Sequence, residues 1–154
     1  AEVNPTLHQR FLARDPPLRL GTTLAALAAR GAGVVTGHIG DSRIYRVRAG
    51  AIEQITRDHS FEKEREGMTP KKYLMRAVGT TPDVAAEVQM REARAGDLYV
   101  LCTVGLTDVA EDGNILAVCG REREPGKVAE SLVGLALERR TRDNVTVLAL
   151  GLEA

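Results

Sequence analysis

The sequence predicts an α+β domain built from layered β-sheets. Short runs of alternating or continuous apolar residues fill the first two-thirds of the chain, and the clearest helical pattern comes late, followed by one last apolar run. Strand-like runs bounded by glycines and polar turns, with the helices grouped apart from them, are typical of this class. A length of 154 residues without a repeat or linker fits one domain, so we interpret residues 1–154 as a single domain.

Composition limits the kind of partner. The chain has 21 basic and 21 acidic residues and no basic stripe, so neither nucleic acid nor a membrane is indicated as a partner. No apolar run approaches the ~20 residues that span a bilayer, and residues 1–5 show no secretory signal. Cys102 and Cys119 lie in apolar segments and are interpreted as buried, reduced thiols. A cytoplasmic location is therefore expected.

The first part of the chain is predicted to form one short helix and then a strand-rich meander. The helix starts at Asn4-Pro5 and ends before Asp15-Pro16-Pro17. Residues 22–56 alternate between apolar and polar positions and are divided by glycines, which favours strands. Alanine and leucine in residues 21–30 would suit a helix equally well on propensity alone. The clearest strands of the meander are predicted at Val34–Ile39 and Ile44–Val47.

The middle of the chain is predicted to contain two short helices and a strand pair. Ser60 fits the cap of a charged helix that stops at Gly67, and Thr69-Pro70 fits the start of another that runs through Tyr73-Leu74. Residues 86–93 are expected to pair with 98–103, because Ala95-Gly96-Asp97 is a turn signal between two apolar runs.

The last part of the chain is predicted to be a helix followed by a central strand. Residues 126–139 carry Val128, Leu132 and Leu135 on one helical face, which should pack on a sheet. Val145–Leu150 is nearly all apolar, which is typical of a strand buried on both faces.

Three aspartates lie at chain reversals beside apolar runs and are candidate ligands of a divalent cation. They are Asp41, Asp108 and Asp143, which are expected to converge at one end of the sheets. Mg²⁺ and Mn²⁺ prefer carboxylate oxygens, and strand ends hold such ligands rigidly. The residues alone leave a simpler alternative open. Aspartates at turns commonly bond their own backbone, and Asp41 could pair with Arg43.

Six short motifs occur in order along the chain, and together they are specific. They are Gly21-Thr22-Thr23-Leu24, residues 38–45, Thr56-Arg57-Asp58-His59-Ser60, residues 76–80, residues 96–108, and residues 142–147. From about residue 18 to its end, the chain resembles the bacterial branch of the metal-dependent type 2C (PPM) protein serine/threonine phosphatases. His38 and His59 lie inside these motifs, and structural hydrogen bonding is the favoured role for both.

The resemblance implies a fold, a reaction and a set of ligands. The fold is a sandwich of two antiparallel β-sheets flanked by helices, in which Thr22–Ala29 is a strand. The reaction is hydrolysis of phosphoserine and phosphothreonine in proteins by a water that Mg²⁺ or Mn²⁺ ions activate. Asp143 aligns with a ligand of the binuclear centre, and Asp41 and Asp108 align with ligands of an adjacent third-metal site.

The sequence departs from the family pattern in two places. The N-terminal strands of the family, with their acidic ligand and Asp-Gly-Met-Gly-Gly-like segment, have no counterpart here, so open sheet edges that allow self-association are expected. Val104 stands where the family places an Asp, and valine has no lone pair for a metal ion. No complete catalytic set is therefore expected, and low activity is predicted.

Two alternatives to an impaired enzyme stay open at this point. One is a catalytically inactive binding or regulatory module that keeps the phosphatase fold. The other is a fragment whose fold and metal site are completed by another chain.

Overall fold

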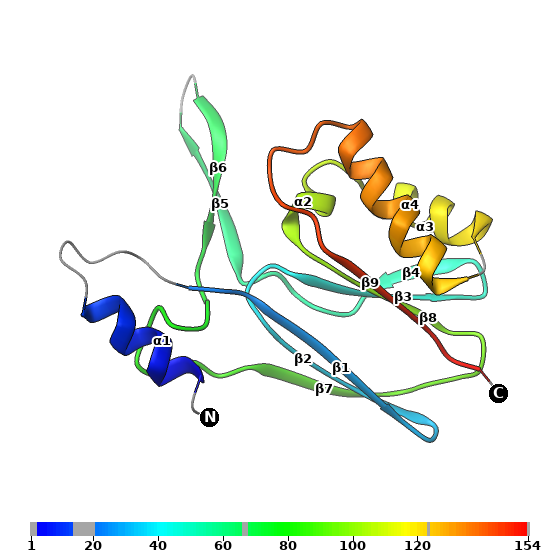
Figure 1. Cartoon of the computed structure of the whole chain (residues 1–154), viewed down its shortest axis with the longest axis horizontal. Helices are drawn as coiled ribbons and strands as arrows, with labels where there is room; N and C mark the ends of the chain where they lie inside the picture. Colours follow the sequence, from blue (N-terminus) through cyan, green and yellow to red (C-terminus); the bar gives the residue numbers. More distant parts are fainter. Residues whose placement is uncertain (1–2, 14–20, 66–67, 123, 154) are drawn as a thin grey trace.

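Four helices and nine strands lie within residues 3–13, 21–65, 68–122 and 124–153, the parts of the chain that this computed structural model describes (Figure 1). The helices are α1 (Val3–Leu12), α2 (Val104–Thr107), α3 (Asp112–Arg121) and α4 (Pro125–Glu138). The strands are β1 (Leu24–Arg30), β2 (Gly33–Ile39), β3 (Arg43–Arg48), β4 (Ala51–Gln54), β5 (Ser60–Arg65), β6 (Met68–Leu74), β7 (Glu87–Glu92), β8 (Leu98–Cys102) and β9 (Val147–Gly151).

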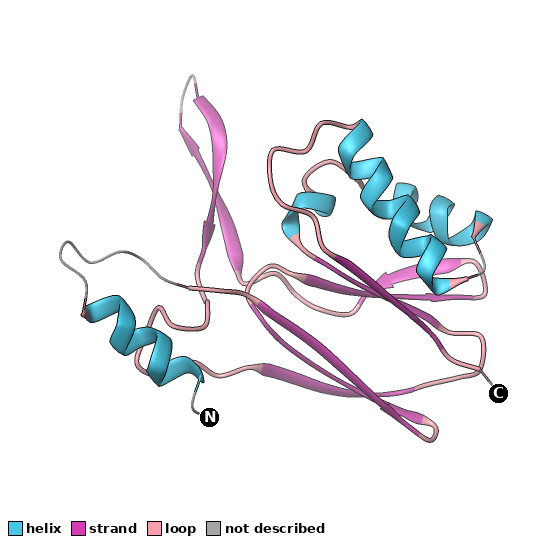
Figure 2. Cartoon of the chain, in the orientation of Figure 1, coloured by secondary structure: helices cyan, strands magenta, loops and turns pink. Residues whose placement is uncertain are grey.

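The strands form two antiparallel sheets and a separate hairpin. One sheet has the order β1-β2-β7 and the other has the order β4-β3-β8-β9, and β5 pairs with β6. Helices α3 and α4 cover one face of the four-stranded sheet, and the three-stranded sheet lies on its other side (Figure 2). The predicted α+β class with two antiparallel sheets is confirmed. The meander over residues 22–56 is confirmed as well, and so is the helix over 126–139 within one residue at each end.

The four-stranded sheet separates two hydrophobic cores, because successive residues of a strand point to opposite faces. On β3, Ile44 faces the three-stranded sheet and Tyr45 faces the helices; on β8, Tyr99 and Val100 divide in the same way, and all four are 0% exposed. Helix α4 covers the core on the helical side of the four-stranded sheet with apolar residues at helical spacing. These are Val128, Leu132 and Ala136, also 0% exposed, with Leu135 packed beside them.

The side chains of Asn4 and His8 hold helix α1 against the loop at the end of the three-stranded sheet, with His8 Nδ1 3.3 Å from the Gly79 carbonyl oxygen. The amide of Asn4 donates to the carbonyl oxygens of Thr81 (3.1 Å) and Pro82 (2.7 Å), and its Oδ1 accepts from the Gly79 N–H at 2.7 Å. The predicted N-terminal helix is confirmed at residues 3–12, and it ends at Leu12, before Asp15 as expected.

The two helices predicted in residues 60–74 are wrong, because this segment is the β5–β6 hairpin. Phe61 on β5 and Tyr73 on β6 are opposite each other in the register, and their rings stack with centroids 5.6 Å apart. The charged residues have good helix propensity, yet cross-strand pairing of aromatic residues outweighs a preference of a few tenths of a kcal/mol per residue. The helix boundary expected at Gly67 lies outside the described residues.

The predicted pairing of residues 86–93 with 98–103 is also wrong. Strand β7 pairs with β2, and β8 pairs with β3 and β9, so the turn between them joins two different sheets. Asp97 in this turn is 1% exposed and is held by Arg48 of β3, whose Nε and Nη2 donate to its two oxygens at 2.5 and 2.6 Å. The Arg94 N–H donates to the same carboxylate at 2.9 Å, so the turn is fixed against the four-stranded sheet rather than closing a hairpin.

The predicted central position of the last strand is wrong. Strand β9 begins at Val147 and lies at the edge of its sheet, with Leu148 54% exposed. An apolar run cannot distinguish a central strand from an edge strand whose outer face is partly covered. The expected self-association through open edges stays a prediction.

The two cysteines are buried and free, as predicted. Cys102 lies on β8 and Cys119 on α3. Burial raises the pKa of Cys102 to about 12 and that of Cys119 to about 11. None of the helices in the described parts of the chain is long and apolar enough to span a bilayer.

The Arg48–Asp97 pair generates a stability prediction. Replacing Asp97 by Asn should lower the free energy of unfolding by about 2–4 kcal/mol, because Arg48 then faces a neutral amide at a buried position. Glu92→Gln is the matched control: its ion pair with Arg94 joins side chains 64% and 60% exposed, and its loss should leave the free energy of unfolding nearly unchanged. Urea denaturation measures both, and equal losses would contradict a structural role for the buried pair.

The same pair predicts part of the acid sensitivity. Hydrogen bonds from Arg48 hold the pKa of Asp97 below its usual 3.8. As the pH falls, the Asp97 carboxylate therefore binds a proton at a higher pH in the unfolded chain than in the folded protein. The stabilisation that ionised Asp97 provides is complete above the usual pKa and is lost as the pH falls through the lowered pKa of the folded state. Between about pH 6 and pH 3, Asp97→Asn should lose less unfolding free energy than the unaltered protein. If both proteins lost the same free energy of unfolding over this pH range, the acid sensitivity would come from groups other than Asp97.

Candidate metal site

The loop between β2 and β3 carries Asp41, and a glycine fixes its shape. Gly40 has φ +104°, a left-handed conformation, and a Cβ at this position would clash with the side chain of Thr23. The Thr23 and Ser42 hydroxyl groups are hydrogen-bonded at 2.7 Å, which joins the loop to the residues before β1. Asp41 is therefore held at the start of β3, and 14% of its side chain is exposed.

Helix α2 brings the Val104 segment against the residues before β9. A Cβ on Gly105 would clash with the Asn144 carbonyl oxygen, so only glycine allows this approach. Thr103 reinforces it, because its N–H donates to the Thr146 carbonyl at 3.1 Å and its hydroxyl accepts from the Thr146 N–H at 3.0 Å. Val104 directly precedes Gly105, and Asp143 directly precedes Asn144.

Asp108 and Asp143 line one cavity of 430 Å³ at this end of the molecule. Both side chains are exposed, and Oδ1 of Asp143 accepts the N–H of Asn144 at 2.8 Å. The remaining residues of the cavity wall are Val109, Arg140, Thr141 and Arg142. The bond to Asn144 agrees with the simpler alternative for a turn aspartate, although it leaves the second carboxylate oxygen of Asp143 for another partner.

Asp41 lies at the same end of the four-stranded sheet but does not line that cavity. The register places Arg43 opposite Cys102, and Cys102 opposite Val147, so the loops before β3 and β9 and after β8 share one edge. The Asp41 carboxylate instead lies 3.6 Å from Nζ of Lys72 on β6. The three predicted aspartates are thus on one end of the sheet, with two of them around one cavity.

The alternative pairing of Asp41 with Arg43 is wrong. Arg43 binds Asp58 with two hydrogen bonds, from Nε and Nη2, each 2.9 Å long. Burial alone would raise the pKa of Asp58, but the hydrogen bonds and charge of Arg43 outweigh it, and the pKa is lowered. The Arg43–Asp58 pair therefore fastens the 56–60 segment to β3.

His38, His59 and Glu87 are the described residues whose ligand atoms come within 4.8 Å of one another in a possible metal-binding group. The His38 Nε2 donates to the Arg57 carbonyl at 2.9 Å, and the two imidazole rings stack with centroids 4.5 Å apart. His59 Nδ1 accepts the Gly40 N–H at 3.1 Å, so its proton is on Nε2, which faces Glu87 at 3.3 Å.

This histidine group suits hydrogen bonding better than a metal ion. A neutral ligand needs a free lone pair on one ring nitrogen, and both nitrogens of His59 are used. The structural role predicted for His38 and His59 therefore agrees with the contacts. Sequence reasoning missed Glu87, because only the unpredicted pairing of β7 with β2 brings it opposite His38.

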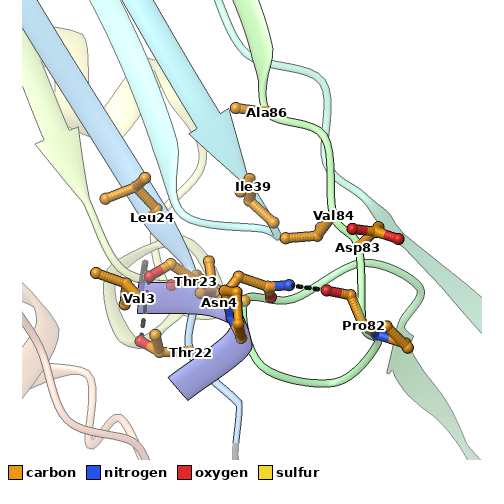
Figure 3. A pocket seen from close by; sticks show the side chains of 12 residues that line it. Val3, Asn4, Thr22, Thr23, Leu24, Ile39, Pro82, Asp83, Val84 and Ala86 are labelled. Carbon is orange, nitrogen blue, oxygen red and sulfur yellow. Dashed lines mark hydrogen bonds between the residues drawn. The ribbon is translucent and has the colours of Figure 1, made fainter. Parts of the chain in front are cut away.

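A second cavity, of 420 Å³, lies between α1 and the three-stranded sheet (Figure 3). Its wall is mainly aliphatic, with Leu24, Ile39 and Val84 facing it, and the amide of Asn4 is already bound to the 79–82 loop. This lining offers packing surface rather than convergent ligands for a charged group.

The described residues do not fit a pair of metal ions. Two divalent ions ~3.5–4 Å apart need several bridging carboxylates to offset their repulsion, whereas the cavity offers Asp143 and Asp108 beside two arginines. Val104, whose side chain offers no ligand atom, directly precedes Gly105, which contacts Asn144 at this end of the molecule. One hard cation with water ligands is compatible with the two carboxylates.

Comparisons with known proteins agree with the fold and the motifs. A family model described as Protein phosphatase 2C matches residues 5–128. The chain is 39% identical over 146 residues to the serine/threonine protein phosphatase PstP of Mycobacterium tuberculosis, covering 87% of this chain and 28% of that protein. The chain thus spans less than a third of the length of this relative.

Solved structures confirm the fold. The crystal structure of the Mycobacterium tuberculosis serine/threonine phosphatase PstP/Ppp has a TM-score of 0.85 at 34% identity, covering 98% of this chain and 68% of that one. The catalytic domain of PstP in complex with 2 manganese ions has a TM-score of 0.82 at 34% identity, covering 97% of this chain and 67% of that one. The predicted sandwich is therefore confirmed, and the chain belongs to the protein phosphatase 2C family.

Proposed function

We propose that this domain hydrolyses phosphoserine and phosphothreonine in proteins with the help of Mg²⁺ or Mn²⁺. The observation that carries the proposal is the cavity that Asp108 and Asp143 share, in a chain of the protein phosphatase 2C family. A related catalytic domain has been solved in complex with 2 manganese ions, which supports the choice of metal.

The three aspartates have distinct roles in this proposal. Asp143 is a ligand of the binuclear centre, and Asp108 and Asp41 are ligands of the adjacent third-metal site. Bound cations would lower the pKa of a water molecule and neutralise phosphoryl oxygens. The Asn144 N–H keeps the Asp143 carboxylate oriented, since it binds Oδ1 at 2.8 Å.

Val104 makes the 154 residues a poor catalyst in this proposal. It lies at the start of α2, next to the Gly105–Asn144 contact that brings it near Asp143. A side chain without oxygen at this position removes one ligand, and no Asp-Gly-Met-Gly-Gly-like segment occurs in the printed sequence to supply others. Full turnover therefore needs ligands beyond those in these residues.

The second candidate function is that of a binding module without catalysis, and Val104 is the observation that favours it. A carboxylate cluster repels itself without metal, so replacing one acid by valine stabilises the metal-free fold. Such a module would bind a phosphoprotein, and its affinity would not depend on a divalent cation.

Val104→Asp should tighten Mn²⁺ binding by on the order of tenfold, because its carboxylate and Asp143 can chelate one ion together. Isothermal titration measures the affinity. Adding Asp143→Asn should abolish the gain, and this substitution retains an oxygen for the Asn144 N–H. Leu137→Asp is the matched control, since Leu137 is 64% exposed on α4 and the change adds the same charge away from the site. A gain equal to that of Leu137→Asp would contradict the assignment of Asp143.

Phosphatase activity should be near background for the 154 residues, because too few carboxylates surround the reacting phosphate. Val104→Asp alone should recover only part of the rate, and a chain that also carries an N-terminal Asp-Gly-Met-Gly-Gly segment should recover most of it. The two effects should not be additive, since both act on the same transition-state charge. The rate on a phosphothreonine peptide with Mn²⁺ is the measurement. Robust metal-dependent turnover by the unaltered chain would show that the ligands are misplaced here.

A further inference from the structure

Lys72 of the β5–β6 hairpin places an ammonium group at the Asp41 carboxylate. Its Nζ lies 3.6 Å from Asp41 Oδ2 and 3.5 Å from Asp58 Oδ2. The three side chains are only 27%, 14% and 17% exposed, so their charges are less screened than those of a surface pair. A cation of the protein itself is therefore present at one predicted metal ligand.

Asp41 needs this cation more than Asp58 does. Asp58 already accepts two hydrogen bonds from Arg43 and one from Gln54 Nε2 at 3.2 Å. For Asp41, Lys72 is the one lysine or arginine within 4 Å among the residues that the structure describes. Lys72, which also donates to Asp58 at 3.5 Å, is thus shared by the two carboxylates, but Asp58 has Arg43 as a second cation.

The hairpin that carries Lys72 stands away from both sheets (Figure 1). At its base, the Met75 N–H donates to the His59 carbonyl at 2.8 Å, and the His59 N–H donates to the Gly40 carbonyl at 2.9 Å. Gly40 directly precedes Asp41. Further from the base, the Lys72 ion pairs link the hairpin to the end of the sheet.

We propose that Lys72 is an internal counter-cation of Asp41, which a divalent cation must displace, and that its displacement releases the β5–β6 hairpin from the sheet end. The inference rests on the proposed function, because it takes Asp41 as a cation ligand. An ammonium group and a divalent cation at one carboxylate repel each other, and more strongly in a partly buried site than in water. Cation binding and hairpin position are therefore coupled, and the coupling acts in both directions.

Mn²⁺ titration of four variants tests the competition. Lys72→Met should tighten Mn²⁺ binding by about five-fold, because the ion no longer displaces an ammonium group. Lys63→Met, which removes the same charge from an exposed position on β5 of the same hairpin, should change the affinity less than about two-fold. In Asp41→Asn protein, adding Lys72→Met should give no gain.

Hydrogen exchange tests the release of the hairpin without any metal. Backbone amides of β5 and β6 should exchange faster in Lys72→Met than in the unaltered protein and in Lys63→Met. Saturating Mn²⁺ should produce the same acceleration in the unaltered protein and none beyond it in Lys72→Met.

Three results would overturn the inference. They are equal Mn²⁺ affinities for Lys72→Met and Lys63→Met, a gain that persists with Asn at position 41, and hairpin exchange that Lys72→Met leaves unchanged. The proposed function is judged separately, by Mn²⁺ binding that depends on Asp143. If that binding is present and Lys72 has no effect, only the present inference fails.

Discussion

Burial of the four-stranded sheet on both faces is the constraint on which the other features of this molecule depend. Adjacent residues of β3 and β8 enter different cores: Ile44 and Tyr99 face the second sheet, whereas Tyr45 and Val100 face the helices. Shifting either strand by one residue would exchange these faces and bury polar side chains in both cores. The register is therefore fixed. The ends of β3, β8 and β9 come to one edge in a defined order, which places the aspartate loops.

The sequence predicted those parts of the fold whose local pattern and tertiary environment agree. Val128, Leu132 and Leu135 repeat apolar positions with the period of the helix that they form, and packing reinforces the pattern. The 60–74 hairpin, the pairing of β7 with β2 and the edge position of β9 were not predicted. Each depends on which distant segment lies alongside, and a local window of sequence holds no information on that.

The candidate site, like the fold, could be predicted only in part. Ordered motifs were enough to single out Asp108 and Asp143, and the structure places both around one cavity. The partners of the charged side chains could not be predicted, because they come from other elements. Lys72 of the hairpin lies at Asp41, and Arg43 forms an ion pair with Asp58. Charge compensation is chosen among groups that the fold brings within a few ångströms, so it follows from tertiary structure.

The two buried cysteines have a practical consequence for work on this protein. A thiolate is the reactive form toward maleimides and iodoacetamides, and a thiol whose pKa is about 12 or about 11 is almost entirely protonated at neutral pH. Cys102 and Cys119 are the two cysteines of the sequence, and both are buried. A single cysteine introduced on the surface would therefore react far faster than either of them. Spectroscopic probes can be attached at one chosen position while the native thiols, and the packing that they contribute, stay in place.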